Sequence, residues 1–255
     1  MRIAFEIGGR QYAADLSRGV SLAIPVNFDG PQPSFFGAAK ATSEPVKSGD
    51  FVGDTRKGGS CNVRSYRMVP HCNGTHTECV GHIVDEGVGV ADKLPGTPIP
   101  ATLISVKPAG DVIDATAIHA ALLRHSLIGF HRALILRTLP NGGDKLIRRY
   151  EGAIPAPYLS TEAVELLVKA GVEHLLTDIP SLDPAEDGGK MAAHRVFWGL
   201  AKGHALADAR RPDATLTELI YVPDSLADGY YLLDLQVPAF MTDAAPSRPI
   251  LYPVG

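Results

Sequence analysis

Hydrophobic residues along this chain come in short runs, separated by glycine, proline and other turn residues. Residues 1–6 and 11–14 lie on either side of Gly8-Gly9, a pattern typical of a β-hairpin with a glycine turn. The segments 101–106 and 133–138 are short and mostly apolar, which indicates strands buried on both faces. Further strands are predicted at 66–69 and 172–178, and near Leu216 and Leu232.

Three segments have the pattern of helices, at 113–123, 160–171 and 192–203. The second begins with Ser160, a favourable N-cap, carries acidic residues in its first turn and stops at Gly171. Strands dominate the first hundred residues, whereas strands and helices mix in the later part of the chain. We therefore expect an α/β fold, with residues 1–255 in one compact domain.

The segment 27–60 is rich in proline, glycine, serine and aspartate, and it predicts a long irregular loop. A loop of that length is either functional or mobile. Its aromatic residues Phe28, Phe35 and Phe36 either line a pocket or fasten the loop to the core.

Composition narrows the class of protein. Of the 255 residues, 45% are hydrophobic and 20% charged, and the formal net charge of −4 offers no basic surface for nucleic acid or an anionic membrane. No apolar run approaches the roughly 20 residues of a membrane span, and residues 1–6 lack the apolar core of a secretory signal. Cys61, Cys72 and Cys79 are odd in number and crowded together, so a reducing cytoplasm is expected rather than a disulfide framework.

Three histidines and a glutamate lie close together within the segment 71–82. Imidazole and carboxylate groups are suitable ligands for Zn²⁺, Mn²⁺ or iron, and Cys72 offers a thiolate besides. In an extended strand, residues of equal parity share a face, so His76, Glu78 and His82 would point the same way. In such a strand Cys72 would be in phase with them, and His71 would point away. The alternative is that these are loop histidines that bind no metal. That alternative would explain a single histidine more easily than it explains this cluster.

The segment Gly74-Thr75-His76-Thr77-Glu78, with His82 four residues further on, resembles the signature of the cyclase family, which includes kynurenine formamidases (arylformamidases) and isatin hydrolases. That signature is His-x-Gly-Thr-His-x-Asp-x-Pro-x-His. Other similar features follow in the family's order and at about its spacing, over nearly the whole chain: Asp15-Leu16-Ser17, Leu136-Arg137-Thr138, Thr177-Asp178-Ile179-Pro180-Ser181-Leu182-Asp183, His194, Glu218 and Pro246-Ser247-Arg248-Pro249.

The resemblance implies a site and a fold. By position, His76 and Glu78 would be metal ligands, and His82 a ligand to a second metal or a proton shuttle. His194 and Glu218 would complete the site, as ligands or in the proton chemistry. The implied fold has a mixed, barrel-like β-sheet core with flanking helices, of the swivelling β/β/α type. One or two Zn or Mn ions, a small-molecule substrate and a homo-oligomer, dimer or tetramer, are the expected partners.

Three departures from the family's signature separate this chain from its best-known members. The first histidine of the signature aligns with Cys72, so that either Cys72 supplies a thiolate or His71 reaches the metal. Parity favours Cys72. Glu78 replaces the usual aspartate of the signature, and the usual proline is missing from residues 79–81. The substrate of the best-known members therefore does not follow from the resemblance.

The expected function is hydrolysis of a carbon–nitrogen bond in an aryl formamide, similar to N-formylkynurenine, or in a cyclic amide. A metal that lowers the pKa of bound water from 15.7 to about 7 would supply the attacking hydroxide. His82 or His194 would move the proton, and Glu218 would bind metal or orient a histidine. The alternatives are a non-catalytic binding protein of the same fold, a cysteine nucleophile at Cys72 or Cys79, and Ser-His-Asp chemistry, for which the Gly-x-Ser-x-Gly elbow is missing.

Overall fold

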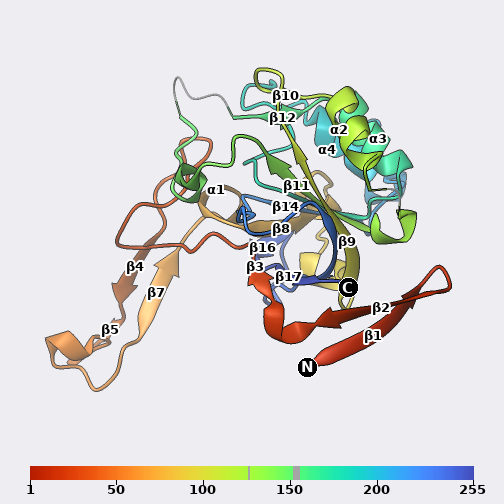
Figure 1. Ribbon diagram of the computed structural model, residues 1–255. Coiled ribbons are helices and arrows are strands. Elements are labelled where there is room, and N and C mark those ends of the chain that lie inside the picture. Colours follow the sequence, from red (N-terminus) through yellow and green to blue (C-terminus); the bar gives the residue numbers. More distant parts are fainter. Residues whose placement is uncertain (126, 152–155) are drawn as a thin grey trace.

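The computed structural model describes residues 1–125, 127–151 and 156–255, and a strongly curled, mixed nine-stranded sheet dominates this part of the chain (Figure 1). Its strands follow the order β16-β8-β14-β13-β11-β9-β15-β17-β3. The neighbours β14, β13, β11 and β9 run parallel, and all other neighbours in the sheet run antiparallel. The strands are β3 (Val20–Ser21), β8 (His76–Cys79), β9 (Ile99–Val106), β11 (Ala133–Thr138), β13 (His174–Thr177), β14 (Thr215–Glu218), β15 (Gly229–Asp234), β16 (Ala244–Pro246) and β17 (Ile250–Pro253).

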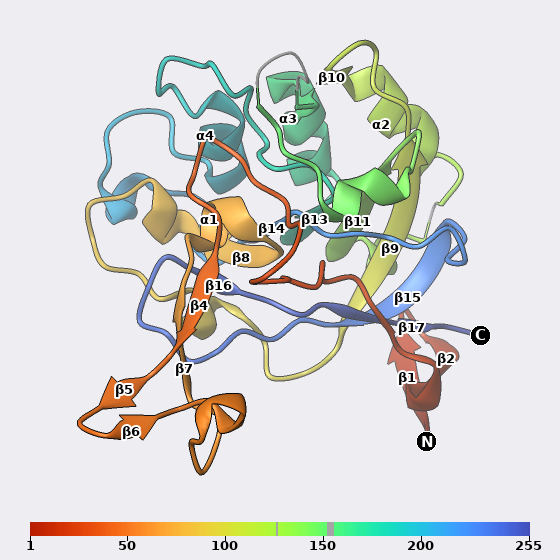
Figure 2. The ribbon, with the colours of Figure 1, turned by 90° about the vertical axis from the view of Figure 1, so that its left-hand side faces the viewer.

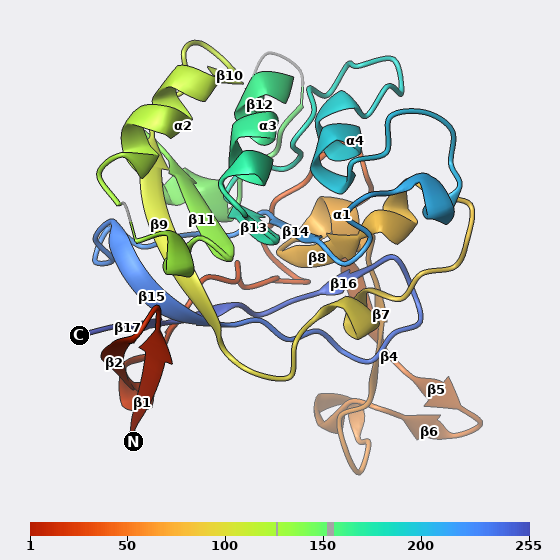
Figure 3. The same ribbon diagram turned by 90° about the vertical axis from the view of Figure 1, so that its right-hand side faces the viewer.

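The central strands are buried on both faces, as their continuous apolar runs predict. In β11, Leu134 and Leu136 belong to the core on one face of the sheet, and Ala133 and Ile135 to the core on the other. Helices cover the first of these faces (Figure 3): α2 (Ala115–Leu122), α3 (Thr161–Lys169) and α4 (Ala192–Trp198). The predicted α/β fold with a barrel-like mixed sheet and flanking helices is confirmed.

Local capping explains where the helices begin and end. The Ser160 hydroxyl accepts a hydrogen bond from the Ala163 amide at 3.2 Å, which confirms the predicted start of α3. The helix α4 stops five residues before the predicted 203, because Gly199 adopts a left-handed φ of 66° and ends it. Within the described ranges, none of the helices has both the length and the apolar character needed to cross a bilayer.

The N-terminal third adds two hairpins to this core. The strands β1 (Arg2–Ile7) and β2 (Arg10–Asp15) pair across Gly8-Gly9, as predicted. A second pair, β4 (Thr42–Pro45) and β7 (Arg64–Arg67), carries the small hairpin β5 (Lys47–Ser48) and β6 (Phe51–Val52) away from the main body (Figure 2). The strand predicted at 66–69 therefore lies two residues earlier.

The segment 27–60 is less irregular than its composition suggests, because three of these strands lie within it. The buried side chain of Gln32 ties the loop together, since its amide donates to the carbonyls of Asn27 and Ala41 and its oxygen accepts from the Ala41 amide. Phe35 is buried against the core and fastens the loop, whereas Phe36 is exposed.

The remaining elements are short. They are β10 (Val112–Ile113), β12 (Tyr158–Leu159) and α1 (Pro70–Asn73), with 3₁₀ turns at η1 (Leu16–Arg18), η2 (Thr55–Lys57), η3 (Val80–His82), η4 (Val90–Lys93), η5 (Ile128–Phe130), η6 (Gly143–Leu146) and η7 (Leu206–Asp208).

His174 on β13 makes the stability of the fold depend on pH. Its side chain is buried at 2% exposure, its Nδ1 lies 2.9 Å from the Thr215 hydroxyl, and its Nε2 has no hydrogen-bond partner in the described structure. Burial, assisted by the nearby charge of Arg132, lowers the pKa of His174 to about 4. An unfolded histidine has a pKa near 6.5. Between pH 7 and 4 the unfolded state therefore binds a proton that the folded state does not bind, and the free energy of unfolding decreases as the pH is lowered.

We expect this one residue to remove about 2 kcal/mol of unfolding free energy between pH 7 and 5, at 1.36 kcal/mol per pH unit below the unfolded pKa. His174→Asn places an amide where Nδ1 lies and does not titrate. Urea unfolding of both proteins at the two pH values measures the difference. Equal pH dependence in both proteins would show that His174 is not the cause.

Candidate metal centre

The segment 70–82 forms a helical turn, a strand and a 3₁₀ turn, which together direct its side chains at one place. Pro70 begins the single turn of α1, where its fixed φ suits the first helical position. After Gly74 the chain enters β8, and it leaves that strand through the 3₁₀ turn η3, which contains His82. His76 and Glu78 therefore share a strand face as predicted. The expectation that one extended strand continues from 72 to 82 is wrong, because only 76–79 forms a strand. Cys72 lies in the helical turn α1 and His82 in the 3₁₀ turn η3. The alternation of faces along a strand therefore does not determine where their side chains point.

The strand β14 brings Glu218 against this segment. It pairs antiparallel with β8 so that Glu218 lies directly opposite His76, and the Glu218 Oε2 atom is 3.5 Å from His76 Nε2. The backbone amide of Leu182 donates to Glu218 Oε1 at 2.9 Å and fixes the carboxylate. His76 Nδ1 lies 3.0 Å from the Gly74 carbonyl, which can only accept, so Nδ1 carries the proton and Nε2 presents a lone pair to the centre.

His194 enters from the helix α4 and is buried, although its sequence context is that of a surface histidine at a helix start. Asp183 accepts hydrogen bonds from the amides of Ala193 and His194 and lies 2.5 Å from His194 Nδ1. The opposite nitrogen, Nε2, is thereby directed at Glu78 Oε1, 3.2 Å away. Trp198 is buried on the same helix face, with its ring centroid 5.7 Å from that of His194.

One side of the centre is open to solvent. Glu78 is only 1% exposed, whereas the side chains of His71, His82 and Asp243 are 25%, 27% and 36% exposed. The His71 and His82 rings stack with centroids 4.5 Å apart. Asp243 Oδ2 lies 3.2 Å from His71 Nε2 and 3.3 Å from His82 Nδ1. Solvent therefore reaches the centre from this side.

The charges of the centre are mutually stabilised. Burial by itself raises the pKa of Glu78, but His82, His194 and His71 together hold that pKa well below its usual range. Burial lowers the pKa of His194, yet Asp183 and Glu78 outweigh it and raise that pKa to about 10. Asp243 and Glu78 likewise raise the pKa of His71 to about 10 against the effect of burial. The carboxylates therefore favour positive charge at this buried site, whether as protonated imidazole or as a bound cation.

The donor set fits a divalent metal ion. Four buried atoms at the centre have no hydrogen-bond partner in the described structure: His71 Nε2, His76 Nε2, Glu78 Oε1 and Glu78 Oε2. Three overlapping groups have ligand atoms within 4.8 Å of one another: His76, Glu78 and Glu218; Glu78, His82 and His194; and His71, His82 and Asp243. Two ligands about 2.1 Å from one ion at a tetrahedral angle lie roughly 3.4 Å apart, close to the separations of 3.2 to 3.5 Å found here.

The position of Asp183 gives a prediction about metal affinity. A carboxylate that holds the far nitrogen of a ligating histidine fixes its tautomer and orientation, and losing such a partner costs about 10–100-fold in metal affinity. We expect Asp183→Asn to weaken Zn²⁺ binding by that factor, measured by competition with a chromophoric chelator. Asp187→Asn is the matched control, because Asp187 also accepts backbone amides ahead of α4, those of Gly189 and Met191. Equal affinity in the two variants would contradict the role of Asp183.

Cys72 differs in position from the other sequence candidates. It is buried on α1 and, among the described residues, belongs to none of the three groups, whereas its neighbour His71 belongs to one. Burial and the charge of Glu218 raise the pKa of the Cys72 thiol. Burial also raises the pKa of Cys79 to about 11. Two buried, protonated thiols argue against a cysteine nucleophile.

Two residues of the centre had no role in the sequence interpretation. Asp183 ends the stretch 177–183 that resembles the family, and it follows a strand, as many functional carboxylates do. Asp243 has no comparable signal, because its contacts with His71 and His82 join positions more than 160 residues apart. Only the pairing of β16 beside β8 brings it into place.

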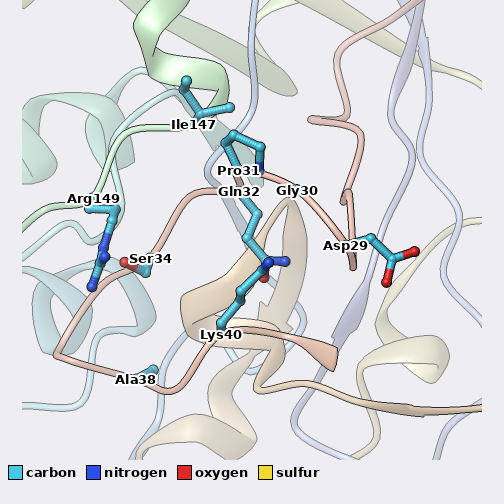
Figure 4. A pocket seen from close by; sticks show the side chains of 9 residues that line it. All are labelled: Asp29, Gly30, Pro31, Gln32, Ser34, Ala38, Lys40, Ile147 and Arg149. Carbon is cyan, nitrogen blue, oxygen red and sulfur yellow. The ribbon is translucent and has the colours of Figure 1, made fainter. Parts of the chain in front are cut away.

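A pocket of about 530 Å³ lies elsewhere, between the loop 29–40 and residues 147–149 (Figure 4). Lys40 and Arg149 give it two positive side chains, and none of the residues of the candidate metal centre lines it. The chemistry described above therefore belongs to the buried histidine cluster and not to this pocket.

The chain is similar to several known proteins. The model of the cyclase family matches residues 14–184. A kynurenine formamidase of Bacillus cytotoxicus is 29% identical over 199 residues, which cover 77% of this chain and 82% of that protein. One of Bacillus cereus is 28% identical over 203 residues, with the same coverage.

Solved structures share the fold. Isatin hydrolase A from Labrenzia aggregata, bound to benzyl benzoate, superposes with a TM-score of 0.62 at 16% identity, over 92% of this chain and 93% of that one. The structure of a predicted metal-dependent hydrolase from Bacillus stearothermophilus gives a TM-score of 0.59 at 14% identity, over 92% and 98%.

Proposed function

Because the chain belongs to the cyclase family, we propose that it is a metal-dependent hydrolase of a carbon–nitrogen bond in a small amide. The substrate class is an aryl formamide, similar to N-formylkynurenine, or a cyclic amide. Kynurenine formamidases among its relatives and isatin hydrolases among the similar structures support this choice. The observation that carries the proposal is the convergence of buried, unpartnered imidazole and carboxylate atoms around Glu78.

His76, Glu78, His194 and Glu218 would hold Zn²⁺ or Mn²⁺ at the buried end of the centre. When bound, such an ion lowers the pKa of water to about 7 and polarises a carbonyl. The residues of the chain prepare this site in advance. The Gly74 carbonyl and Asp183 orient His76 and His194, and the Leu182 amide orients Glu218.

Burial separates the roles of the two histidines proposed for proton transfer. His194 is fully enclosed, with Nδ1 held by Asp183 and Nε2 directed at Glu78, so it serves as a ligand and does not meet the substrate. His82 lies on the open side, where a ligand of a second ion and a proton shuttle are both sterically feasible. The substrate approaches from that side.

The proposal is tested by hydrolysis assays on metal-free and reloaded protein. Protein stripped with a chelator should be inactive towards a panel of aryl formamides, lactams and cyclic imides, and Zn²⁺ or Mn²⁺ should restore hydrolysis of at least one of them. Full activity in the stripped protein would exclude the metal. Metal binding without hydrolysis of any panel member would favour the non-catalytic alternative.

A further inference from the structure

We propose that Asp243 is a metal ligand of this centre, and that it joins His71 and His82 to hold a divalent ion on the open side. This set differs from the one that the family's signature implies, in which the position of Cys72 supplies the ligand. The inference rests on the proposed function in that it takes the centre to bind divalent metal.

The contacts of His71 place its Nε2 atom between two carboxylate oxygens, where a ligand of a shared cation would lie. Its Nε2 atom is buried and lies 3.3 Å from Glu78 Oε2 and 3.2 Å from Asp243 Oδ2. Neither contact has the geometry of a hydrogen bond, and the atom has no other partner within the described structure. A nitrogen directed between two carboxylate oxygens at these distances is suited to a shared cation.

Asp243 is held in place by its backbone. It precedes β16, its carbonyl accepts a hydrogen bond from the Cys79 amide at 3.0 Å, and the next residue, Ala244, pairs with Glu78. Gly81 leaves room for its side chain, because a Cβ atom at position 81 would lie 3.2 Å from Asp243 Cβ. The backbone is therefore fixed beside Glu78, and the carboxylate lies 3.2 and 3.3 Å from the two histidines.

Glu78 connects this outer set with the buried one. Its Oε2 atom lies 3.3 Å from His71 Nε2 and 3.9 Å from His82 Nε2, while Oε1 faces His194 at 3.2 Å. A glutamate that presents one oxygen to each set can bridge two ions, as carboxylates do in two-metal sites. The proposal assigns His82 to the metal rather than to proton transfer.

Cobalt binding to the full-length protein tests the proposal without using activity. Co²⁺ per chain is measured by equilibrium dialysis and elemental analysis, and circular dichroism establishes that each variant is folded. We expect two ions per chain in the wild type and one in Asp243→Asn and in His71→Gln. Cys72→Ser and Asp92→Asn, an exposed acid on the neighbouring turn η4, should keep two, and no thiolate-to-cobalt charge-transfer band should appear.

The proposal is overturned if Asp243→Asn binds as many ions as the wild type with unchanged affinity. A thiolate band that disappears in Cys72→Ser would also overturn it and would return the ligand position to Cys72. The expected stoichiometries in a protein that hydrolyses no panel member would refute the proposed function while leaving this inference intact. If the protein hydrolyses a panel member but Asp243→Asn does not change its metal content, the proposed function would stand and this inference would fail.

Discussion

Glu78→Gln is expected to abolish metal binding and hydrolysis together. Glu78 belongs to two of the ligand groups, and three histidine nitrogens lie 3.2 to 3.9 Å from its oxygens. Glutamine fills the same volume but replaces one oxygen by an NH₂ group, which cannot bind a cation. Since losing a partner of a ligand already costs about 10–100-fold, we expect a loss of more than about 100-fold in metal affinity and in hydrolysis rate.

Elemental analysis and the hydrolysis rate, measured on the same preparation, check this result. Glu78→Asp keeps the charge, so it should retain more metal than Glu78→Gln. Glu165→Gln, a change of an exposed residue on α3, is the matched control. His76→Ala should behave like Glu78→Gln. A Glu78→Gln protein with its full metal content would remove Glu78 from the ligand set.

Lys145→Met is expected to cost the largest amount of stability. Lys145 and Asp178 are each 2% exposed, and their Nζ and Oδ2 atoms lie 2.7 Å apart. Lys145 also donates to the carbonyl and hydroxyl oxygens of Thr138. Burial raises the pKa of Asp178, and the charge of Lys145 opposes that shift. Removing one partner of a buried ion pair leaves the other charge uncompensated, at about 3–5 kcal/mol.

Urea unfolding at neutral pH measures this loss. The double variant Lys145→Met/Asp178→Asn buries no lone charge and keeps an acceptor for the Thr138 amide, so it should recover more than half of the loss. Lys107→Met, at an exposed position, should change the free energy of unfolding by less than about 0.5 kcal/mol. A loss of that small size in Lys145→Met would show that the pair adds nothing to the fold.

Features set by neighbouring residues were predictable from the sequence. The hairpin across Gly8-Gly9, the Ser160 cap and the buried strand 133–138 depend on turn preference, capping and hydrophobic pattern, and all three are found. The parity argument failed beyond 76–79. It required a continuous strand, and Pro70 and the turn at 80–82 interrupt the segment on both sides.

The assembly of the site was not predictable from local pattern. Glu218 opposite His76 and Asp243 beside His71 depend on strand pairing between distant segments. Resemblance to the family supplied His194 and Glu218 but not Asp243, because Asp243 lies outside the motifs that carry the resemblance. The Lys145–Asp178 pair likewise joins two loops that follow different strands. The expected cytoplasmic location and the expected dimer or tetramer stay predictions.

The most direct test of the metal centre is X-ray diffraction from crystals of the zinc-loaded protein, recorded at the zinc absorption edge. The account predicts an anomalous peak about 2.0–2.2 Å from His76 Nε2 or His194 Nε2 and from a Glu78 oxygen. Zinc-loaded crystals without a peak among these side chains, or with zinc bound only elsewhere, would contradict it.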